Sequence, residues 1–330
     1  MALVGNLASH RRRGRPAPPS HLVPTLAVAP PDPSDQPASA PATRAGRRVP
    51  LALATWALIG LVLAVVIVLL VLKVTQGAAT VAGGLTGPAV APAPAGVVDA
   101  ATHVPASAYD AVGAPIAPGP APALVAGQPP ATVGGQPAVV FVGAEFCPYC
   151  AAERWVLVTA LSRFGTFSHL GATSSAANQV FPRSATFTFD GVAYTSRYVA
   201  LAAVEAYADA PSSTAPAGVP KLHDPTPLET SMLRRYGAAG PSGPVLPFVD
   251  VGNRLVAVGA SIGLSPGPLA GQSMEQIAGA LSDPTAPTTI AILGAANEVD
   301  AAVCALTGQQ PAAVCGAPGV RAGAARLGLG

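Results

Sequence analysis

Charged and aromatic residues are scarce in this sequence of 330 residues, at 10% and 5% of the chain. No GxGxxG, Walker, HExxH or GxSxG motif is present, so nucleotide-dependent and hydrolytic chemistry have no specific basis and no cofactor is expected. The five histidines form no cluster, and the four cysteines include only one close pair, which disfavours a zinc site. These absences direct the search for chemistry to the cysteines.

Proline and glycine are abundant instead, with 37 and 35 residues, together about a fifth of the chain. That share lies above the usual ~12% and below the ~25–30% of a low-complexity chain, so we expect one part to fold and another part not to. Residues 74–135 consist mainly of Gly, Ala, Pro and Val. Such a composition does not bury enough apolar surface to offset chain entropy, and it predicts a linker. Within it, residues 98–113 are less monotonous and are candidates to pack against the following domain.

Positive charge is concentrated before a long apolar run. Residues 1–48 carry seven arginines against two aspartates and are predicted to form a disordered basic tail. From Leu51 to Leu72 the chain has 22 uncharged residues, which as a helix would span roughly 33 Å and cross a membrane. The preceding arginines place the N-terminus in the cytoplasm and the rest of the chain outside. The sequence therefore predicts a single-pass protein of the cell membrane with its transmembrane helix within residues 49–73.

Other interpretations of this N-terminal part remain open. Gly77-Ala78-Ala79 resembles the cleavage site of a signal peptide, although the apolar run is longer than the usual ~7–15 residues. The arginines at 11–15 are a candidate contact for anionic lipid or nucleic acid, but the cluster is short and lacks interleaved aromatics. We interpret it as a determinant of topology and expect no nucleic-acid partner.

A folded domain is predicted over residues 136–318, where the composition changes. Residues 138–142 form an apolar run of strand length, and residues 151–164 carry apolar groups near helical spacing. Between them lie Cys147-Pro148-Tyr149-Cys150. The order of strand, loop, CxxC and helix is typical of a redox motif.

The spacing of these two cysteines suits disulfide exchange. At a helix N-terminus Cys147 meets unpaired backbone N–H groups and the positive end of the helix dipole, which favour the thiolate. Cys150 follows within reach and can resolve a mixed disulfide. Cys147 is thus the predicted nucleophile and Cys150 the resolving thiol. A permanently oxidised structural pair and a thiolate site for a metal such as Cu(I) are the alternatives.

The other two cysteines, Cys304 and Cys315, are separated by ten residues, and Cys304 lies near the end of a helix predicted over residues 288–306. In an oxidising compartment they are predicted to form a structural disulfide that contributes on the order of 3 kcal/mol. The alternative is a second redox pair that passes electrons to Cys147 and Cys150.

A predicted strand hairpin and a predicted helix in the C-terminal half support an α/β fold. Residues 248–251 and 254–258 are predicted to form strands joined by Gly252-Asn253, and an S-x-x-Q capping box opens a helix from Ser273 to about residue 281. In this order the chain resembles the thioredoxin superfamily. Residues 136–318 are more specifically similar to the membrane-anchored family called domain of unknown function 929, in the segments FVGAEFCPYCAAERW (141–155), ALSRFGTFSHLGATSS (160–175), ATFTFDGVAYTSRYVALAAVE (185–205) and CALTGQQPAAVC (304–315).

The resemblance implies an α/β, thioredoxin-like fold with a large insertion, residues 166–244, between the first helix and the C-terminal hairpin. It also implies that Pro247 takes the place of the cis-proline that lies against the active-site sulfurs and helps to bind the substrate peptide. Where thioredoxins carry an acidic residue six positions before the first cysteine this chain has Phe141, and Glu145 is the only nearby carboxylate. Residues 319–330 are predicted to be a disordered tail.

These observations predict a membrane-anchored, extracytoplasmic thiol–disulfide oxidoreductase. Its partners would be protein thiols or disulfides and an unidentified protein that resets the cysteine pair. The alternatives are a non-catalytic binding module with a structural CxxC disulfide and a metal-handling protein.

Overall fold

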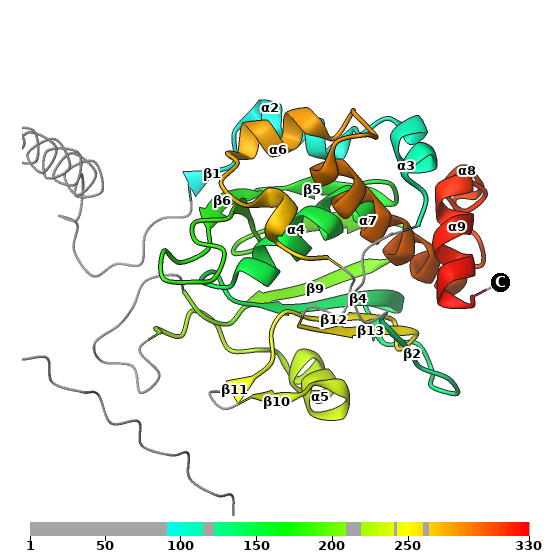
Figure 1. Cartoon of the computed structure of the whole chain (residues 1–330). Coiled ribbons are helices and arrows are strands. Elements are labelled where there is room, and N and C mark those ends of the chain that lie inside the picture. Colours follow the sequence, from blue (N-terminus) through cyan, green and yellow to red (C-terminus); the bar gives the residue numbers. More distant parts are fainter. Residues whose placement is uncertain (1–90, 115–121, 209–218, 241–242, 260–263, 330) are drawn as a thin grey trace, which may run out of the picture. The chain divides into compact units, whose positions relative to one another are not determined.

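The computed structural model describes residues 91–114, 122–208, 219–240, 243–259 and 264–329. All of them belong to one compact unit, Gly84–Gly330. The predicted basic tail and transmembrane segment lie outside the described residues. The described part is a mixed α/β protein (Figure 1), which confirms the α/β class.

The central sheet is built around β4, Gln136–Gly143. β9, Ala200–Glu205, pairs with one side of β4 in parallel, and β12, Phe248–Val251, pairs with the other side in antiparallel orientation. β13, Leu255–Val258, forms a hairpin with β12 through Gly252 and Asn253, which both have positive φ as a tight turn requires. Two short strands complete the sheet: β2, Ala123–Leu124, beside β13, and β3, Thr132–Val133, beside the start of β4.

Between β4 and β9 the chain forms a helix and two small antiparallel pairs of strands. The helix is α4, Pro148–Leu161. Trp155 of α4 packs against Phe187, with ring centroids 4.5 Å apart, and its indole N–H donates to the carbonyl of Ala185 at 3.0 Å. The first part of the predicted insertion therefore packs on α4. The strands are β5, Gly165–Ser168, paired with β8, Ala193–Ser196, and β6, Gly171–Ser174, paired with β7, Ala185–Thr188, and with β1, Ala91–Pro92.

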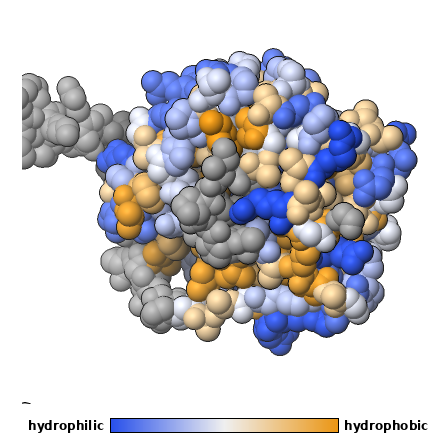
Figure 2. Space-filling model, turned by 45° about the vertical axis from the view of Figure 1, so that its right-hand side comes forward, coloured by the Kyte–Doolittle hydropathy of each residue, from blue (hydrophilic) through white to orange (hydrophobic). Residues whose placement is uncertain are grey.

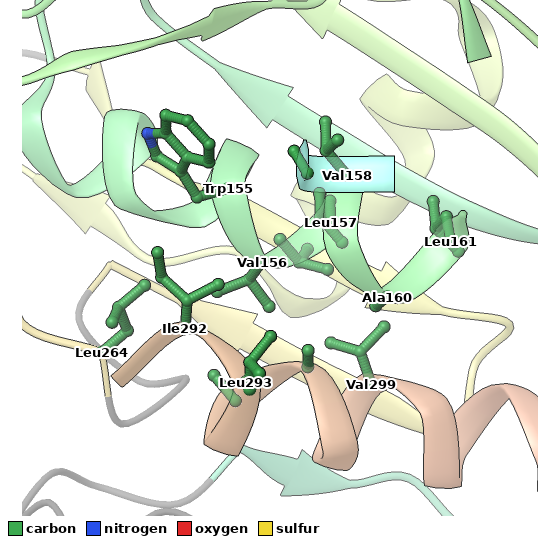
Figure 3. Close-up of a cluster of buried hydrophobic side chains, with 14 of the residues drawn as sticks. Trp155, Val156, Leu157, Val158, Ala160, Leu161, Leu264, Ile292, Leu293 and Val299 are labelled. Atoms are coloured by element: carbon green, nitrogen blue, oxygen red, sulfur yellow. The ribbon is translucent and has the colours of Figure 1, made fainter. Parts of the chain in front are cut away.

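Helices cover both faces of the sheet. On one face α4 packs against α7, Pro287–Leu306, and Figure 3 shows Val156 of α4 lying against Ile292 and Leu293 of α7. α6, Met274–Ala280, begins at the predicted Ser273 capping box and packs on α7 beside the short 3-10 helix η1, Gly267–Leu269. On the other face Met232 of α5, Pro227–Tyr236, packs in a cluster with Val140, Val142 and Phe248. Two short strands, β10, Ala239–Gly240, and β11, Gly243–Pro244, follow α5.

α7 is the one helix among the described residues that is long and apolar enough to cross a membrane, and 78% of its apolar window is buried inside the protein. We therefore assign α7 to the protein core. On the face in Figure 2, the described residues form hydrophobic patches that are separated by hydrophilic ones.

Two segments outside the predicted domain are folded onto it. α2, Ala95–Thr102, packs on α6, and α3, Ala106–Val112, packs on α7. After the short helix α8, Ala312–Cys315, α9, Pro318–Leu327, also packs on α7. The packing expected of residues 98–113 is confirmed. Otherwise the predicted linker, 74–135, and the predicted disordered tail, 319–330, are wrong where they include α2 and α9.

The predictions failed because these helices are rich in alanine and glycine. Such small residues allow helices to pack closely, but they also give the sequence the composition of a spacer. A Cβ atom at Gly323 of α9 would lie 2.4 Å from the carbonyl oxygen of Asn297. The buried Tyr109 of α3 donates from its hydroxyl to the carbonyl of Thr159 at 2.9 Å, and the Asn297 amide donates to the carbonyls of Tyr109 and Gly113 at 2.9 and 2.8 Å. These contacts hold the N-terminal and C-terminal helices on α7.

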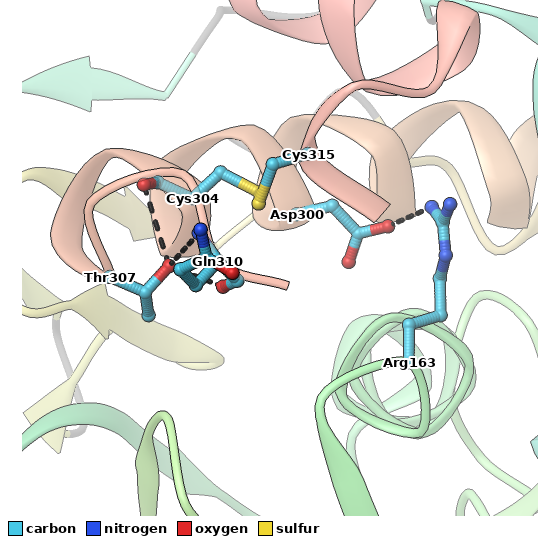
Figure 4. Close-up of a disulfide and its surroundings, with 6 residues drawn as sticks. All are labelled: Arg163, Asp300, Cys304, Thr307, Gln310 and Cys315. Carbon is cyan, nitrogen blue, oxygen red and sulfur yellow. Dashed lines mark hydrogen bonds and ion pairs between the residues drawn. A yellow bond between two sulfur atoms is a disulfide. The ribbon is translucent and has the colours of Figure 1, made fainter. Parts of the chain in front are cut away.

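Charged pairs reinforce the same region. Arg163 lies 4.3 Å from the ring centre of Tyr109 and forms an ion pair with the fully buried Asp300 of α7. Glu298, also on α7, pairs with Arg326 of α9. Figure 4 shows the disulfide that links Cys304, on the same helix as Asp300, to Cys315 of α8, and both cysteines are buried.

Replacing Cys304 and Cys315 together by alanine should lower the free energy of unfolding by about 3 kcal/mol, because the unfolded chain is no longer restricted by the closed loop. Urea denaturation of the full-length protein in detergent, without reductant, measures the effect. The matched control is Cys147→Ala with Cys150→Ala, which leaves this loop closed. Equal stability of the Cys304/Cys315 variant and the unmodified protein would contradict the expectation.

Candidate active site at the CxxC motif

The CxxC motif lies where β4 ends and α4 begins. Cys147 is the N-cap residue of α4, and its sulfur accepts a hydrogen bond from the backbone N–H of Cys150 at 3.3 Å. Pro148 follows in the first turn, where a missing N–H costs no hydrogen bond. Cys147 is 7% exposed and Cys150 is completely buried, and both are free thiols. The strand, loop, CxxC and helix thus follow one another in the predicted order.

The surroundings push the pKa values of the two thiols in opposite directions. A hydrogen bond from the Cys150 thiol lowers the pKa of Cys147, with help from the Cys150 N–H and the charge of Arg154, although burial opposes this shift. Burial raises the pKa of Cys150 well above its ordinary value, and the hydrogen bond and charge of Cys147 add to the increase. Cys147 therefore ionises first, as expected for an attacking thiolate.

The segment before β12 lies beside the same sulfur. The carbonyl oxygen of Leu246 is 3.9 Å from Sγ of Cys147. The Leu246–Pro247 peptide bond is cis. The structure therefore places Pro247 one residue from a contact with Cys147, next to the CxxC motif.

Cys304 and Cys315 lie apart from this site. A Cβ atom at Gly252, which follows β12, would meet the side chain of Leu306, two residues after Cys304. Leu246 precedes β12 by two residues, so roughly 20 Å of extended chain separates it from Gly252. Disulfide exchange requires direct contact between sulfurs, and the helix end that carries Cys304 lies at the opposite end of β12 from the Leu246 contact with Cys147.

A buried ion pair lies close to the two cysteines, and the sequence alone did not reveal it. Arg154 of α4 donates from Nε and Nη2 to the two carboxylate oxygens of Glu205 at 2.8 and 2.6 Å, and both side chains are fully buried. Nη2 also donates to the carbonyl of Ala144 at 2.9 Å. Arg154 follows Cys150 by four residues, which places it on the same face of the helix. The sequence spacing could therefore have shown that Arg154 lies near Cys150. It could not have shown the pairing with Glu205, which is 51 residues further along the chain.

Glu145, the carboxylate noted in the sequence, is also nearly buried. Its Oε1 accepts a hydrogen bond from the hydroxyl of Thr188, and its Oε2 has no partner among the described residues. Its charge interacts with those of Arg154 and Glu205. Phe141, at the position where thioredoxins carry an acid, instead places its ring 6.0 Å from the Arg154 guanidinium.

Comparison with known proteins assigns the chain to a family. The family model described as Domain of unknown function (DUF929) matches residues 125–305. The chain belongs to the DUF929 family. No curated protein matches it, and no solved structure does.

In this DUF929 protein, part of the predicted insertion borders the CxxC motif. The N–H of Ala176 donates to the carbonyl of Phe146 at 3.0 Å, and the rings of Tyr149 and Phe181 meet edge to face at 6.3 Å. Val180, beside Phe181, is 83% exposed. Within the described ranges no group of three or more His, Cys, Asp or Glu residues is arranged to hold a metal ion.

One more buried carboxyl lies on α4, at Glu153, three residues after Cys150. The side chain is 2% exposed, and Oε1 has no hydrogen-bond partner among the described residues. Burial raises the pKa of Glu153 to about 8. At neutral pH this group is therefore mostly protonated in the folded protein.

Glu153 should make the protein less stable as the pH rises from 4.5 to 8. The folded state keeps a proton that the unfolded chain releases in this window, so the free energy of unfolding falls with increasing pH. Glu153→Gln should remove this part of the slope and raise stability at pH 8 by on the order of 3 kcal/mol. Urea denaturation at several pH values measures both effects.

Asp250 and Asp300 should retain part of the slope in that variant, because burial raises their pKa values to about 6 and about 7. The matched control is Glu275→Gln on α6, where the carboxylate is exposed and its backbone N–H lowers the pKa below the window. A slope that is the same in Glu153→Gln and in the unmodified protein would refute the role of Glu153.

Proposed function

We propose that this DUF929 protein is a membrane-anchored, extracytoplasmic thiol–disulfide oxidoreductase. The observation that carries the proposal is the opposed shift of the two thiol pKa values at the start of α4, with Cys147 lowered and Cys150 raised. A CxxC pair that only forms a structural disulfide needs no difference between the two thiol pKa values. An exchange reaction does, because one sulfur has to attack while the other stays protonated until it is needed.

The proposed reaction has two steps. The Cys147 thiolate attacks one sulfur of a substrate disulfide, forms a mixed disulfide, and releases the other substrate sulfur as a thiolate. Cys150 then loses its proton and attacks Cys147, which forms the Cys147–Cys150 disulfide and releases the second substrate sulfur. The substrate is thereby reduced and the protein oxidised by two electrons. A partner dithiol then reduces the Cys147–Cys150 disulfide and returns the two electrons. If the partner is instead a disulfide that oxidises the cysteine pair, the same steps run in reverse and the substrate dithiol is oxidised.

The arrangement of strands supports the finer proposal of a thioredoxin-like fold. The strand β4, the CxxC motif and α4 come before the insertion, and the hairpin β12–β13 after it pairs antiparallel with β4 in the same sheet, in the order of elements that the resemblance implies. α4 and α7 on one face and α5 on the other give the sheet the expected layers. The Leu246 carbonyl lies beside Cys147, in the segment where the resemblance places binding of the substrate peptide.

Two observations support the proposed location. The apolar run at residues 51–72 follows an arginine-rich tail. The buried disulfide between Cys304 and Cys315 is typical of a compartment where thiols become oxidised. An extracytoplasmic domain tethered by one helix agrees with both.

Replacing Cys150 by alanine should trap the substrate on Cys147, since the mixed disulfide is no longer resolved from within the protein. Non-reducing gels of whole cells should then show adducts that disappear on reduction and are absent from the Cys147→Ala, Cys150→Ala control. If no adduct forms under any redox condition, the proposed activity is excluded. A CxxC disulfide that resists reduction would favour a binding module instead, and metal retained by reduced protein would favour metal handling.

A further inference from the structure

Aromatic rings gather beside the CxxC motif, although aromatic residues make up only 5% of the chain. Phe146, directly before Cys147, pairs its ring with that of Tyr207 at 6.4 Å between centroids. Tyr149, between the two cysteines, pairs with Phe181 at 6.3 Å. All four aromatic residues are only partly buried. They form an aromatic rim beside the reactive sulfur, and a partner can still reach it.

Phe181 belongs to the loop of residues 175–184, which joins β6 to β7 within the predicted insertion. Hydrogen bonds close this loop at its base. The N–H of Ser175 donates to the carbonyl of Ser184 at 3.0 Å, and the N–H of Ser184 donates to Oγ of Ser175 at 2.9 Å. The hydroxyl groups of both serines donate to the carbonyl of Phe181, at 2.9 and 3.1 Å. The backbone at Phe181 is therefore held in one position.

The loop is also attached to the elements that carry the motif. Besides the ring pair, the N–H of Ala176 donates to the carbonyl of Phe146 at 3.0 Å. β7, where the loop ends, is tied to α4 by the hydrogen bond from Trp155 to the carbonyl of Ala185. The loop and the sulfur of Cys147 thus keep a fixed relative position, as preorganised recognition requires.

Val180 precedes Phe181 and is exposed to solvent on this loop. The residue is 83% exposed, whereas Leu124 and Val133, the other exposed large apolar residues in the described part of the chain, are 44% and 39% exposed. Isolated exposed apolar residues are common on protein surfaces, but Val180 adjoins the aromatic rim and extends its apolar surface. Accessible apolar surface beside a reactive group is typical of a binding site.

The proposed reaction determines what passes over this surface. The substrate sulfur has to come within a bond length, about 2.05 Å, of the Cys147 sulfur. Cys147 is only 7% exposed, so the chain on either side of the substrate cysteine lies against the residues that surround this small opening. An extended segment advances by about 3.4 Å per residue. The first few side chains beside the substrate cysteine therefore reach the aromatic rim and the loop.

We propose that Val180 and the aromatic rim select substrate cysteines that have apolar side chains close to them in the sequence. This inference rests on the proposed oxidoreductase function and specifies its substrate class. Apolar side chains are mostly buried once a protein has folded. The substrates are therefore exported polypeptides in which such a cysteine is still accessible, and Val180 is a specificity-determining residue of the site.

The full-length Cys150→Ala protein in detergent tests this selection, because Cys147 is then its one free thiol. The substrates are two short peptides that differ only in whether leucine or serine flanks their single cysteine. Each is joined by a disulfide to the coloured leaving group 2-nitro-5-thiobenzoate. The Cys147 thiolate attacks the peptide sulfur and forms a Cys147–peptide disulfide, while the bond to nitrothiobenzoate breaks and the electron pair leaves with that thiolate. The release of colour gives the second-order rate constant.

The leucine peptide should react about tenfold faster than the serine peptide, because its side chain is removed from water on the apolar surface. Each rate is first divided by the rate at which free cysteine attacks the same peptide. Val180→Ser should lower the ratio by about fivefold, and Val180→Leu should preserve it. The matched control is Val133→Ser on β3, which makes the same change at an exposed valine outside the site and should leave the ratio unchanged.

Equal rates for the two peptides, or a ratio that Val180→Ser leaves unchanged, would overturn the selection while the proposed function stands. If Val180→Ser left the ratio unchanged and turned a dimer into a monomer in size-exclusion chromatography, the loop would be a contact between copies of the chain instead. If Cys147 reacted with neither peptide, the proposed function and the selection would both be overturned.

Discussion

Parallel pairing of β4 with β9 is the constraint on which the rest of the site depends. It brings Gly143 and Glu205 side by side at the edge of the sheet where α4 begins. A Cβ atom at Gly143 would lie 2.3 Å from Cζ of Phe141 and 3.1 Å from Oε2 of Glu205. The absence of a side chain there leaves room for the Phe141 ring and for the carboxylate. Backbone pairing thus determines where the ion pair between Arg154 and Glu205 can form relative to the CxxC motif.

Cys147 and Cys150 have the same side chain, but they differ in how deeply they are buried, and this difference separates their roles. Cys147 sits at the N-cap of α4 with a small exposed fraction, and Cys150 one turn later has none. The N-cap position gives the first sulfur a backbone N–H donor, whereas burial penalises a negative charge on the second. The position of each cysteine in the first turn of α4 thus contributes to the difference, together with the hydrogen bond between the two sulfurs and the charge of Arg154.

The sequence predicted those parts of the protein that local patterns determine. The CxxC at a helix start, the Gly252-Asn253 turn and the helix near residues 288–306 all have short-range signals, and the structure confirms their positions. The partnership of Arg154 with Glu205 was not predicted, because it depends on which strands become neighbours. For residues 91–114 the sequence predicted only that 98–113 could pack against the domain, and the helices there and at residues 318–327 were missed because alanine and glycine give little contrast between apolar and polar faces.

Because α3 and α9 dock on α7, the folded unit of this protein extends beyond the residues that match the family model. A fragment cut to the DUF929 match, residues 125–305, would retain the CxxC motif and both residues of the buried ion pair. It would also leave Cys304 as an unpaired thiol and deprive the buried Asn297 and Glu298 of their hydrogen-bond partners. An expressed fragment that is meant to fold should extend at least from Ala91 to Leu327, and a loss of stability in a shorter one would reflect the hydrogen bonds that these polar groups no longer make.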